Sequence, residues 1–131
     1  MIDHLGLGVP DLAAAKAYYD EIMPLVGYEP FFQADKQFSY QRTQGKPGTH
    51  LFFYVADEPG DFSHRRTGLQ HFAFKVRSRR EVDAVHERAV ALGSKTVRPP
   101  AIYSQYHENY YAAFWLDPHG FLLEAVCHVP E

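Results

Sequence analysis

The strongest constraint on the fold of this chain is a strand pattern that occurs twice. Residues 2–9 and residues 69–76 both place a histidine third and then alternate large apolar residues with small or polar ones. The first of these histidines, His4, recurs 67 positions later as His71. Self-similarity at a long, fixed period is the signature of a duplicated supersecondary unit. We therefore expect two copies of one structural module.

Both halves of the chain predict the same order of elements. Alternating apolar residues indicate strands, an apolar stripe at helical spacing indicates a helix, and Gly, Pro and Asp mark the breaks. In the first half we predict a helix over residues 12–23, with Asp11 as its N-cap, and strands over residues 2–9, 28–32, 38–42 and 51–55. In the second half we predict a helix that begins with a capping box of Ser78 and Glu81 and ends before Gly93, and strands over residues 69–76, 95–98, 110–116 and 121–128.

The predicted order βαβββ–βαβββ defines an α+β fold. We expect one domain over residues 1–131, made of repeats at about 1–56 and 69–128 and joined by the polar segment 57–68. The two modules are expected to form an open, curved mixed sheet around a cavity, with the helices on the outside.

Composition narrows the class of protein further. The formal net charge of −3 leaves no basic surface for nucleic acid, and no apolar stretch is long enough to span a membrane. Cys127 is the only cysteine, so an intrachain disulfide is excluded. The first residues lack the basic and apolar regions of a signal peptide. We expect a cytoplasmic protein that binds a small molecule.

Strand alternation brings three possible metal ligands to one kind of sheet face. His4 and His71 lie on the face turned away from the following helix, and small residues accompany them. Near the end of the chain, Glu124 alternates out of phase with Leu123 and occupies the corresponding face of the last strand. Two imidazoles and one carboxylate suit a divalent transition metal and leave coordination positions open for substrate or water. The sequence thus predicts a metal site of His4, His71 and Glu124.

The chain resembles the vicinal oxygen chelate superfamily, which includes glyoxalase I, bleomycin-resistance proteins, fosfomycin-resistance thiol transferases and extradiol dioxygenases. The resemblance covers nearly the whole chain, through HLGLGVPDL from His4, GLQHFAF from Gly68 and AFWLDPHGFLLEA from Ala113. It implies that each module forms half of an open barrel and that His4, His71 and Glu124 bind Fe, Mn, Zn or Ni. A glyoxalase I would need a fourth ligand, and counting back 71 positions from Glu124 reaches Phe53. Where thiol transferases of this superfamily carry Thr, this chain has Gly6.

A second concentration of polar chemistry lies in the segment 103–111. Its residues Tyr106, His107 and Tyr110 are candidates for orienting a substrate or transferring a proton, and cavity lining is the alternative. We interpret His50 as a residue at a strand edge or in solvent, with a supplementary metal ligand as the alternative. If the strand over residues 51–55 is shifted by one position, however, His50 and its alternate neighbours face the cavity.

These features support two hypotheses of different classes. The first is a metal-dependent enzyme of the lyase, isomerase or dioxygenase type, in which the metal holds two substrate oxygens. The second is a metal-free protein that binds or sequesters a small molecule in an aromatic cavity. In both cases we expect a homodimer, because paired modules leave open sheet edges.

Overall fold

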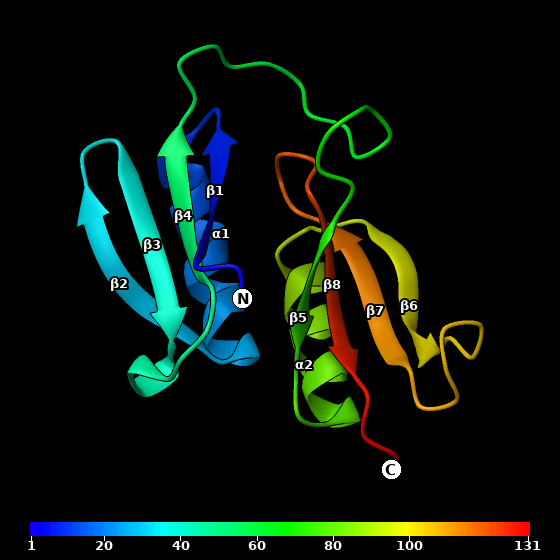
Figure 1. Cartoon of the computed structure of the whole chain (residues 1–131). Helices are drawn as coiled ribbons and strands as arrows, with labels where there is room; N and C mark the ends of the chain where they lie inside the picture. The colour runs from blue at the N-terminus through cyan, green and yellow to red at the C-terminus, as the bar shows by residue number, and fades with distance from the viewer. The chain divides into compact units, whose positions relative to one another are not determined.

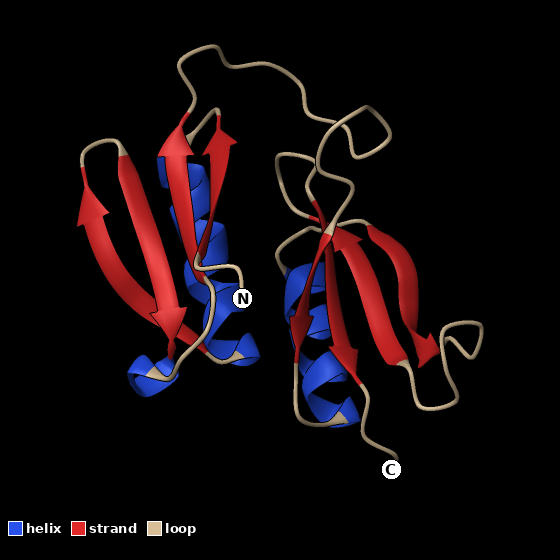
Figure 2. Ribbon diagram, in the orientation of Figure 1, coloured by secondary structure: helices blue, strands red, loops and turns tan.

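The computed structural model describes all 131 residues and divides them into two compact units, Met1–Asp61 and Phe62–Glu131. Unit 1 contains β1 (His4–Val9), α1 (Leu12–Ile22), the 3₁₀ helix η1 (Met23–Val26), β2 (Tyr28–Ala34), β3 (Gln37–Arg42), the 3₁₀ turn η2 (Thr43–Gly45) and β4 (His50–Val55). Unit 2 contains β5 (Phe72–Lys75), α2 (Arg79–Ala91), β6 (Thr96–Ile102), β7 (Tyr111–Leu116) and β8 (Leu122–Cys127). Figure 1 labels these elements, and Figure 2 separates helices from strands by colour.

Each unit is one βαβββ module with its own four-stranded mixed sheet. The strand order is β1-β4-β3-β2 in unit 1 and β5-β8-β7-β6 in unit 2. The first strand of each unit runs parallel to the last, and the other neighbours are antiparallel. The sheets are open rather than closed into barrels. The predicted α+β fold of two βαβββ modules is therefore confirmed, whereas a single domain over both modules stays a prediction.

Helix α1 covers one face of the sheet of unit 1. It begins after Asp11, whose side chain accepts a hydrogen bond from the Ala14 backbone N–H at 3.0 Å, as predicted. The helix buries Tyr19 against Phe53 of β4, with ring centroids 4.4 Å apart. This packing leaves the opposite face of β1, which carries His4, free of the helix.

Helix α2 covers one face of the sheet of unit 2. The Ser78 hydroxyl accepts the backbone N–H of Glu81 at 3.2 Å, which confirms Ser78 as the N-cap. The Glu81 carboxylate accepts the backbone N–H of Arg77 at 2.7 Å and so ties down the residue before the cap. At the other end Gly93 adopts φ +93°, a left-handed conformation that favours glycine, and its N–H bonds to the carbonyl of Val90 at 3.0 Å. The Ser78 N-cap and the Gly93 terminus thus follow the predicted signals, whereas the Glu81 carboxylate bonds to the Arg77 N–H in place of the Ser78 N–H that a capping box requires.

The structure moves several predicted boundaries. The first helix gives way at Met23 to a 3₁₀ turn that contains Pro24. Strand β5 begins only at Phe72, so His71 lies immediately before it. Strand β6 is longer than predicted and runs through two prolines to Ile102, with irregular pairing to β7. Prolines are tolerated there because β6 is an edge strand, where missing N–H donors leave no neighbour unpaired.

The structure contains no helix long and apolar enough to cross a membrane.

Candidate functional site

A continuous row of residues crosses the sheet of unit 2 on the face turned away from α2. Ala73 of β5 lies opposite Glu124 of β8, Glu124 lies opposite Phe114 of β7, and Phe114 lies opposite Arg98 of β6. Residues directly opposite each other on neighbouring strands present their side chains on the same face. Since His71 precedes Ala73 by two positions, it joins this face as well. The strand order that brings these residues side by side is visible in Figure 1.

Glu124 is the centre of this row and is the most deeply buried carboxylate of the chain. Its side chain is 1% exposed, and its Oε1 lies 3.2 Å from Nε2 of His71. Its other oxygen, Oε2, accepts a short hydrogen bond from the hydroxyl of Tyr110. The burial cost of an ionised carboxylate is offset only by partners of this kind. Sequence-based prediction placed both His71 and Glu124 on this face, and the structure brings them together.

The tautomer of His71 decides what the Glu124 contact means. Nδ1 of His71 is hydrogen-bonded to Oε1 of Gln70, so Nδ1 carries a proton and donates it to that bond. In a neutral imidazole Nε2 then bears a lone pair, which faces a carboxylate oxygen. Two acceptors at 3.2 Å are satisfied by a cation between them or by a proton on Nε2. Gln70 therefore orients the His71 ring through Nδ1, as the hydrogen-bond partners of metal-binding histidines do.

Tyr110 serves this arrangement as a hydrogen-bond donor. Burial and the hydrogen bond to Glu124 both raise the pKa of the Tyr110 hydroxyl well above its ordinary value. Tyr110 therefore remains protonated at neutral pH and holds the Glu124 carboxylate by donating to it. This geometry favours a donor or general acid over a base.

The loop between β6 and β7 is fastened at its tip by a pair of histidines. The Asn109 backbone N–H donates to Nδ1 of His107 at 3.0 Å, so the proton of the neutral His107 ring lies on Nε2. That nitrogen is 2.8 Å from Nδ1 of His128 and donates to it. The edge of the His107 ring also meets the ring of Tyr110, with centroids 5.4 Å apart. His107 thus positions the loop and Tyr110 rather than touching Glu124.

We expect replacement of His128 by alanine to loosen this loop without unfolding unit 2. Without its acceptor, His107 loses one of the two hydrogen bonds that fix its ring. The Asn109 N–H should then exchange with solvent faster, by a factor of up to about ten. Hydrogen exchange followed by NMR measures this rate, with His86→Ala on α2 as the matched control. The Tyr103 N–H, which bonds to the Tyr110 carbonyl at 2.8 Å at the base of the loop, should keep its protection. An unchanged Asn109 rate would contradict a fastening role for the pair.

In unit 1, His4 occupies the face predicted for it, but β4 pairs in a register different from the one inferred by counting. Gly6 lies opposite Phe52, as Ala73 lies opposite Glu124 in unit 2. The counterpart of Glu124 is therefore Phe52. The sequence-based assignment of Phe53 was wrong, because that ring packs on the helix face.

This register places His50, the first residue of β4, directly opposite His4, as expected if the strand is shifted by one position. The ring of Phe52 meets the ring of His4 at 5.4 Å between centroids and the ring of His50 at 6.5 Å. Nδ1 of His4 lies 2.7 Å from a carboxylate oxygen of Asp3. His4 belongs to unit 1, while His71 and Glu124 belong to unit 2, and no three His, Cys, Asp or Glu side chains gather in the structure.

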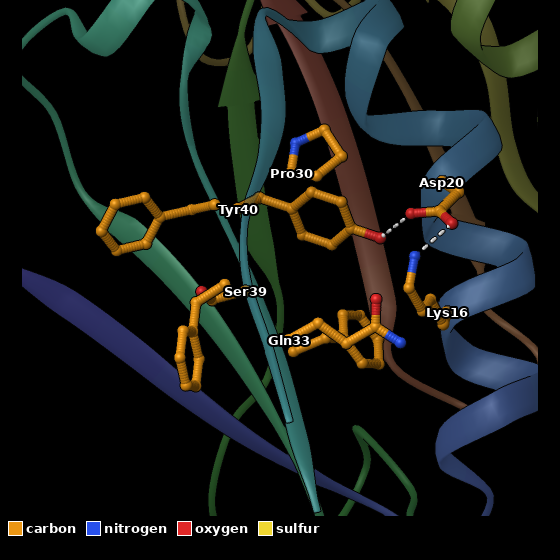
Figure 3. Close-up of a pocket in the computed structure, with 9 residues that line it drawn as sticks. Lys16, Asp20, Pro30, Gln33, Ser39 and Tyr40 are labelled. Carbon is orange, nitrogen blue, oxygen red and sulfur yellow. Dashed lines mark hydrogen bonds and ion pairs between the residues drawn. The ribbon is translucent and has the colours of Figure 1, made fainter. Parts of the chain in front are cut away.

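Unit 1 also contains a shallow pocket between α1 and the β2–β3 hairpin, shown in Figure 3. At one end of it Asp20 accepts hydrogen bonds from the Lys16 ammonium at 2.6 Å and from the Tyr40 hydroxyl at 2.8 Å. Burial and the bond to Asp20 raise the pKa of Tyr40, so its hydroxyl stays protonated. Since Lys16, Asp20 and Tyr40 already satisfy one another, the group is fit to stabilise the packing of α1 on the hairpin.

The duplicated module agrees with comparison to known proteins. The sequence profile of the glyoxalase/bleomycin resistance protein/dioxygenase superfamily matches residues 1–125. The chain belongs to this superfamily. A relative, the uncharacterized protein YqjT of Bacillus subtilis (strain 168), is 26% identical over 131 residues, which cover 94% of this chain and 95% of the relative.

Solved structures of the superfamily share the fold. A glyoxalase/bleomycin resistance protein from Albidiferax ferrireducens T118 has a TM-score of 0.80 at 23% identity, with 98% of this chain and 99% of that chain covered. The fosfomycin resistance protein FosX from Listeria monocytogenes, in complex with Mn(II) and sulfate, has a TM-score of 0.70 at 22% identity, with 98% and 90% covered. At these identities the likeness establishes the fold.

One charged residue on this face of the unit 2 sheet, Arg98, was not singled out by sequence-based prediction. Arg98 was placed at the end of a short strand, because the two prolines after it were expected to open a loop. Alternation along the strand does not identify it, because β6 pairs with β7 through register shifts on both sides of Arg98.

Proposed function

We propose that the chain is a divalent-metal-dependent enzyme acting on a small molecule, with His4, His71 and Glu124 as the protein ligands. The observation that carries the proposal is the pair of facing acceptors on His71, immediately before β5, and on Glu124 of β8. Nε2 of His71 and Oε1 of Glu124 lie 3.2 Å apart, Gln70 fixes the His71 tautomer, and the carboxylate is 1% exposed. A nitrogen and an oxygen placed in this way can both act as ligands of one divalent cation.

The residues around these donors have separate tasks in this proposal. A divalent cation, when bound, supplies a Lewis acid that polarises a substrate oxygen. Tyr110 keeps the Glu124 carboxylate in place by donating a hydrogen bond to it. The Tyr106 ring lies against the Tyr110 ring, with centroids 4.8 Å apart, and is itself exposed to solvent. This arrangement suits lyase, isomerase or dioxygenase chemistry on a substrate with neighbouring oxygens.

Two further parts of the proposal concern His4 and assembly. His4 is the third ligand because it occupies in unit 1 the repeat position that His71 occupies in unit 2, on the face free of the helix. We also infer a homodimer, because each sheet ends on strands that its own module leaves without a second neighbour. Superfamily membership is consistent with a small-molecule ligand, and the Mn(II) complex of FosX is a precedent for a divalent metal on this fold.

A second candidate function, a metal-free binding protein, is favoured by the apolar surroundings of Glu124. Ala112, Phe114, Leu122 and Val126 form a buried cluster on the same face, with partly buried tyrosines against it. A protonated His71 would satisfy Glu124 in such a protein, and the aromatic face would hold a ligand by contact alone.

The metal content of protein purified without added metal separates these functions. We expect close to one divalent ion per chain by elemental mass spectrometry, removal by a chelator, and recovery on titration with Mn(II), Fe(II), Ni(II) or Zn(II). His4→Ala should weaken this binding, while His64→Ala, in the loop of unit 2 that precedes β5, should leave it unchanged. Failure of the chelated protein to bind any of the four ions would overturn the enzyme proposal and leave the metal-free function.

A further inference from the structure

We propose that Arg98 binds an anionic group of the substrate, so that the site accepts small organic acids that carry neighbouring oxygens at one end and an oxyanion at the other. This inference rests on the proposed function of His71 and Glu124 and names the substrate class of that same site.

The placement of Arg98 comes from the register of the sheet. Arg98 lies opposite Phe114, and Phe114 lies opposite Glu124, so Arg98 and Glu124 share a face and are two strands apart. Neighbouring strands are about 4.8 Å apart, which separates the two backbones by roughly 10 Å. A molecule a few bonds long spans that distance. Two ends of one small substrate can therefore meet the two groups together.

The ring of Phe114 forms the floor between the two groups. Its centroid lies 6.1 Å from the His71 ring and 5.4 Å from Cζ of Arg98. Phe114 is 8% exposed and belongs to the buried apolar cluster around Glu124, so the ring between the two groups brings no competing charge. An apolar floor of this kind holds the carbon skeleton of a ligand and strengthens the ionic contacts at its ends.

The guanidinium of Arg98 is fixed in position but retains free donors. It lies over the Phe114 ring and over the Tyr103 ring, whose centroid is 5.6 Å from Cζ, and it donates one hydrogen bond to the Tyr106 hydroxyl at 3.2 Å. The Tyr103 hydroxyl is itself anchored on the Pro99 carbonyl at 2.6 Å, so its ring is a rigid support. No carboxylate pairs with Arg98, in contrast to Arg77, which is paired with Glu81 at 2.9 Å.

This chemistry selects an oxyanion. A guanidinium carries five N–H donors in a planar fork that matches a carboxylate or a phosphonate. Stacking on two rings preorganises the fork, so less side-chain freedom is lost when an anion binds. An exposed, ring-supported arginine at one end and a candidate metal at the other define a ligand with two oxygen-bearing ends.

The test compares three probes that share one end. 2-Oxoglutarate and 2-oxopentanoate carry the same keto acid, but only the former has a distal carboxylate, and 2-oxo-4-phosphonobutanoate replaces that carboxylate by a phosphonate. Titration calorimetry on Mn(II)-loaded protein should show 2-oxoglutarate or the phosphonate binding about tenfold or more tighter than 2-oxopentanoate. A comparison of 2-oxoglutarate with 2-oxo-4-phosphonobutanoate shows whether the site prefers a carboxylate or a phosphonate.

Variants at Arg98 identify the source of that preference. In Arg98→Gln the ratio should fall to about one, and Arg98→Lys, which keeps the charge but lacks the fork, should recover only part of it. Arg80→Gln at the start of α2 is the matched control and should retain the ratio. Equal binding of the probes by the wild-type chain, no binding of either acid, or an unchanged ratio in Arg98→Gln would overturn the proposal.

Metal content measured on the same samples reports separately on the proposed function, and a preference for the diacid that persists in metal-free protein would support the Arg98 site by itself.

Discussion

Replacing Glu124 by glutamine is expected to weaken divalent-metal binding by more than about 100-fold, because the loss of an outer partner alone costs 10–100-fold and Glu124 is a direct donor in the proposed site. The amide has the shape of the carboxylate but no charge. Its oxygen can still accept from Tyr110, and its NH₂ group can donate to Nε2 of His71, so the local hydrogen bonds survive. The expected result is therefore a folded protein that has lost its metal.

Titration calorimetry with Mn(II) and Zn(II) measures this loss, and circular dichroism checks that the fold is kept. Glu87→Gln is the matched control, since Glu87 is an exposed carboxylate on α2 of the same unit. If Glu124→Gln bound metal as tightly as the wild-type chain, His71 and Glu124 would be a structural ion pair, and the metal-free binding function would be favoured.

Local alternation explains why much of the candidate site could be predicted from sequence. In β5 the side chain of Phe74 is buried while Ala73 and Lys75 are exposed, as the period of two requires. The same rule placed Glu124 on the face opposite to Leu123. These assignments depend only on neighbours within one strand, so no knowledge of pairing was needed. The duplicated order of elements added the equivalence of His4 and His71.

Register between strands could not be obtained in the same way. The assignment of Phe53 as the counterpart of Glu124 relied on a count across several loops, and each insertion in a loop shifts such a count. Pairing of β1 with β4 fixes the register instead, and a shift of one position exchanges the two faces of a strand. For this reason Phe52 and His50, rather than Phe53, face the side that carries His4.

The contribution of Arg98 was missed for a related reason. Pro99 and Pro100 read as loop signals, yet an edge strand tolerates them because no neighbour needs their N–H groups. Which strand lies at an edge is a property of the sheet order, which the sequence of one strand does not contain. The contacts of Arg98 with Phe114 and Tyr103 exist only once β6 is paired with β7.

Trp115→Ala is expected to lower the free energy of unfolding by about 3–5 kcal/mol, the range for removal of a large buried aromatic side chain. Trp115 lies on the face of β7 opposite to Phe114, is fully buried, and is the largest of the fully buried side chains. Helix α2 packs on β7 and β8 over this face. The cost has two sources, the lost transfer of the indole from water and the cavity that remains between sheet and helix.

Urea unfolding measures this loss. It is followed by far-ultraviolet circular dichroism and not by fluorescence, because Trp115 is the only tryptophan and the variant has no tryptophan fluorescence. Val97→Ala on the neighbouring strand β6 is the matched control; its side chain is exposed, so the change should lie within about 0.5 kcal/mol. A loss below about 1 kcal/mol in Trp115→Ala would contradict the packing of α2 on this face. The comparison is sharp because Trp115 and Phe114 are adjacent on one strand but face opposite ways, so the loss expected at Trp115 is one of stability, while Phe114 supports the candidate site.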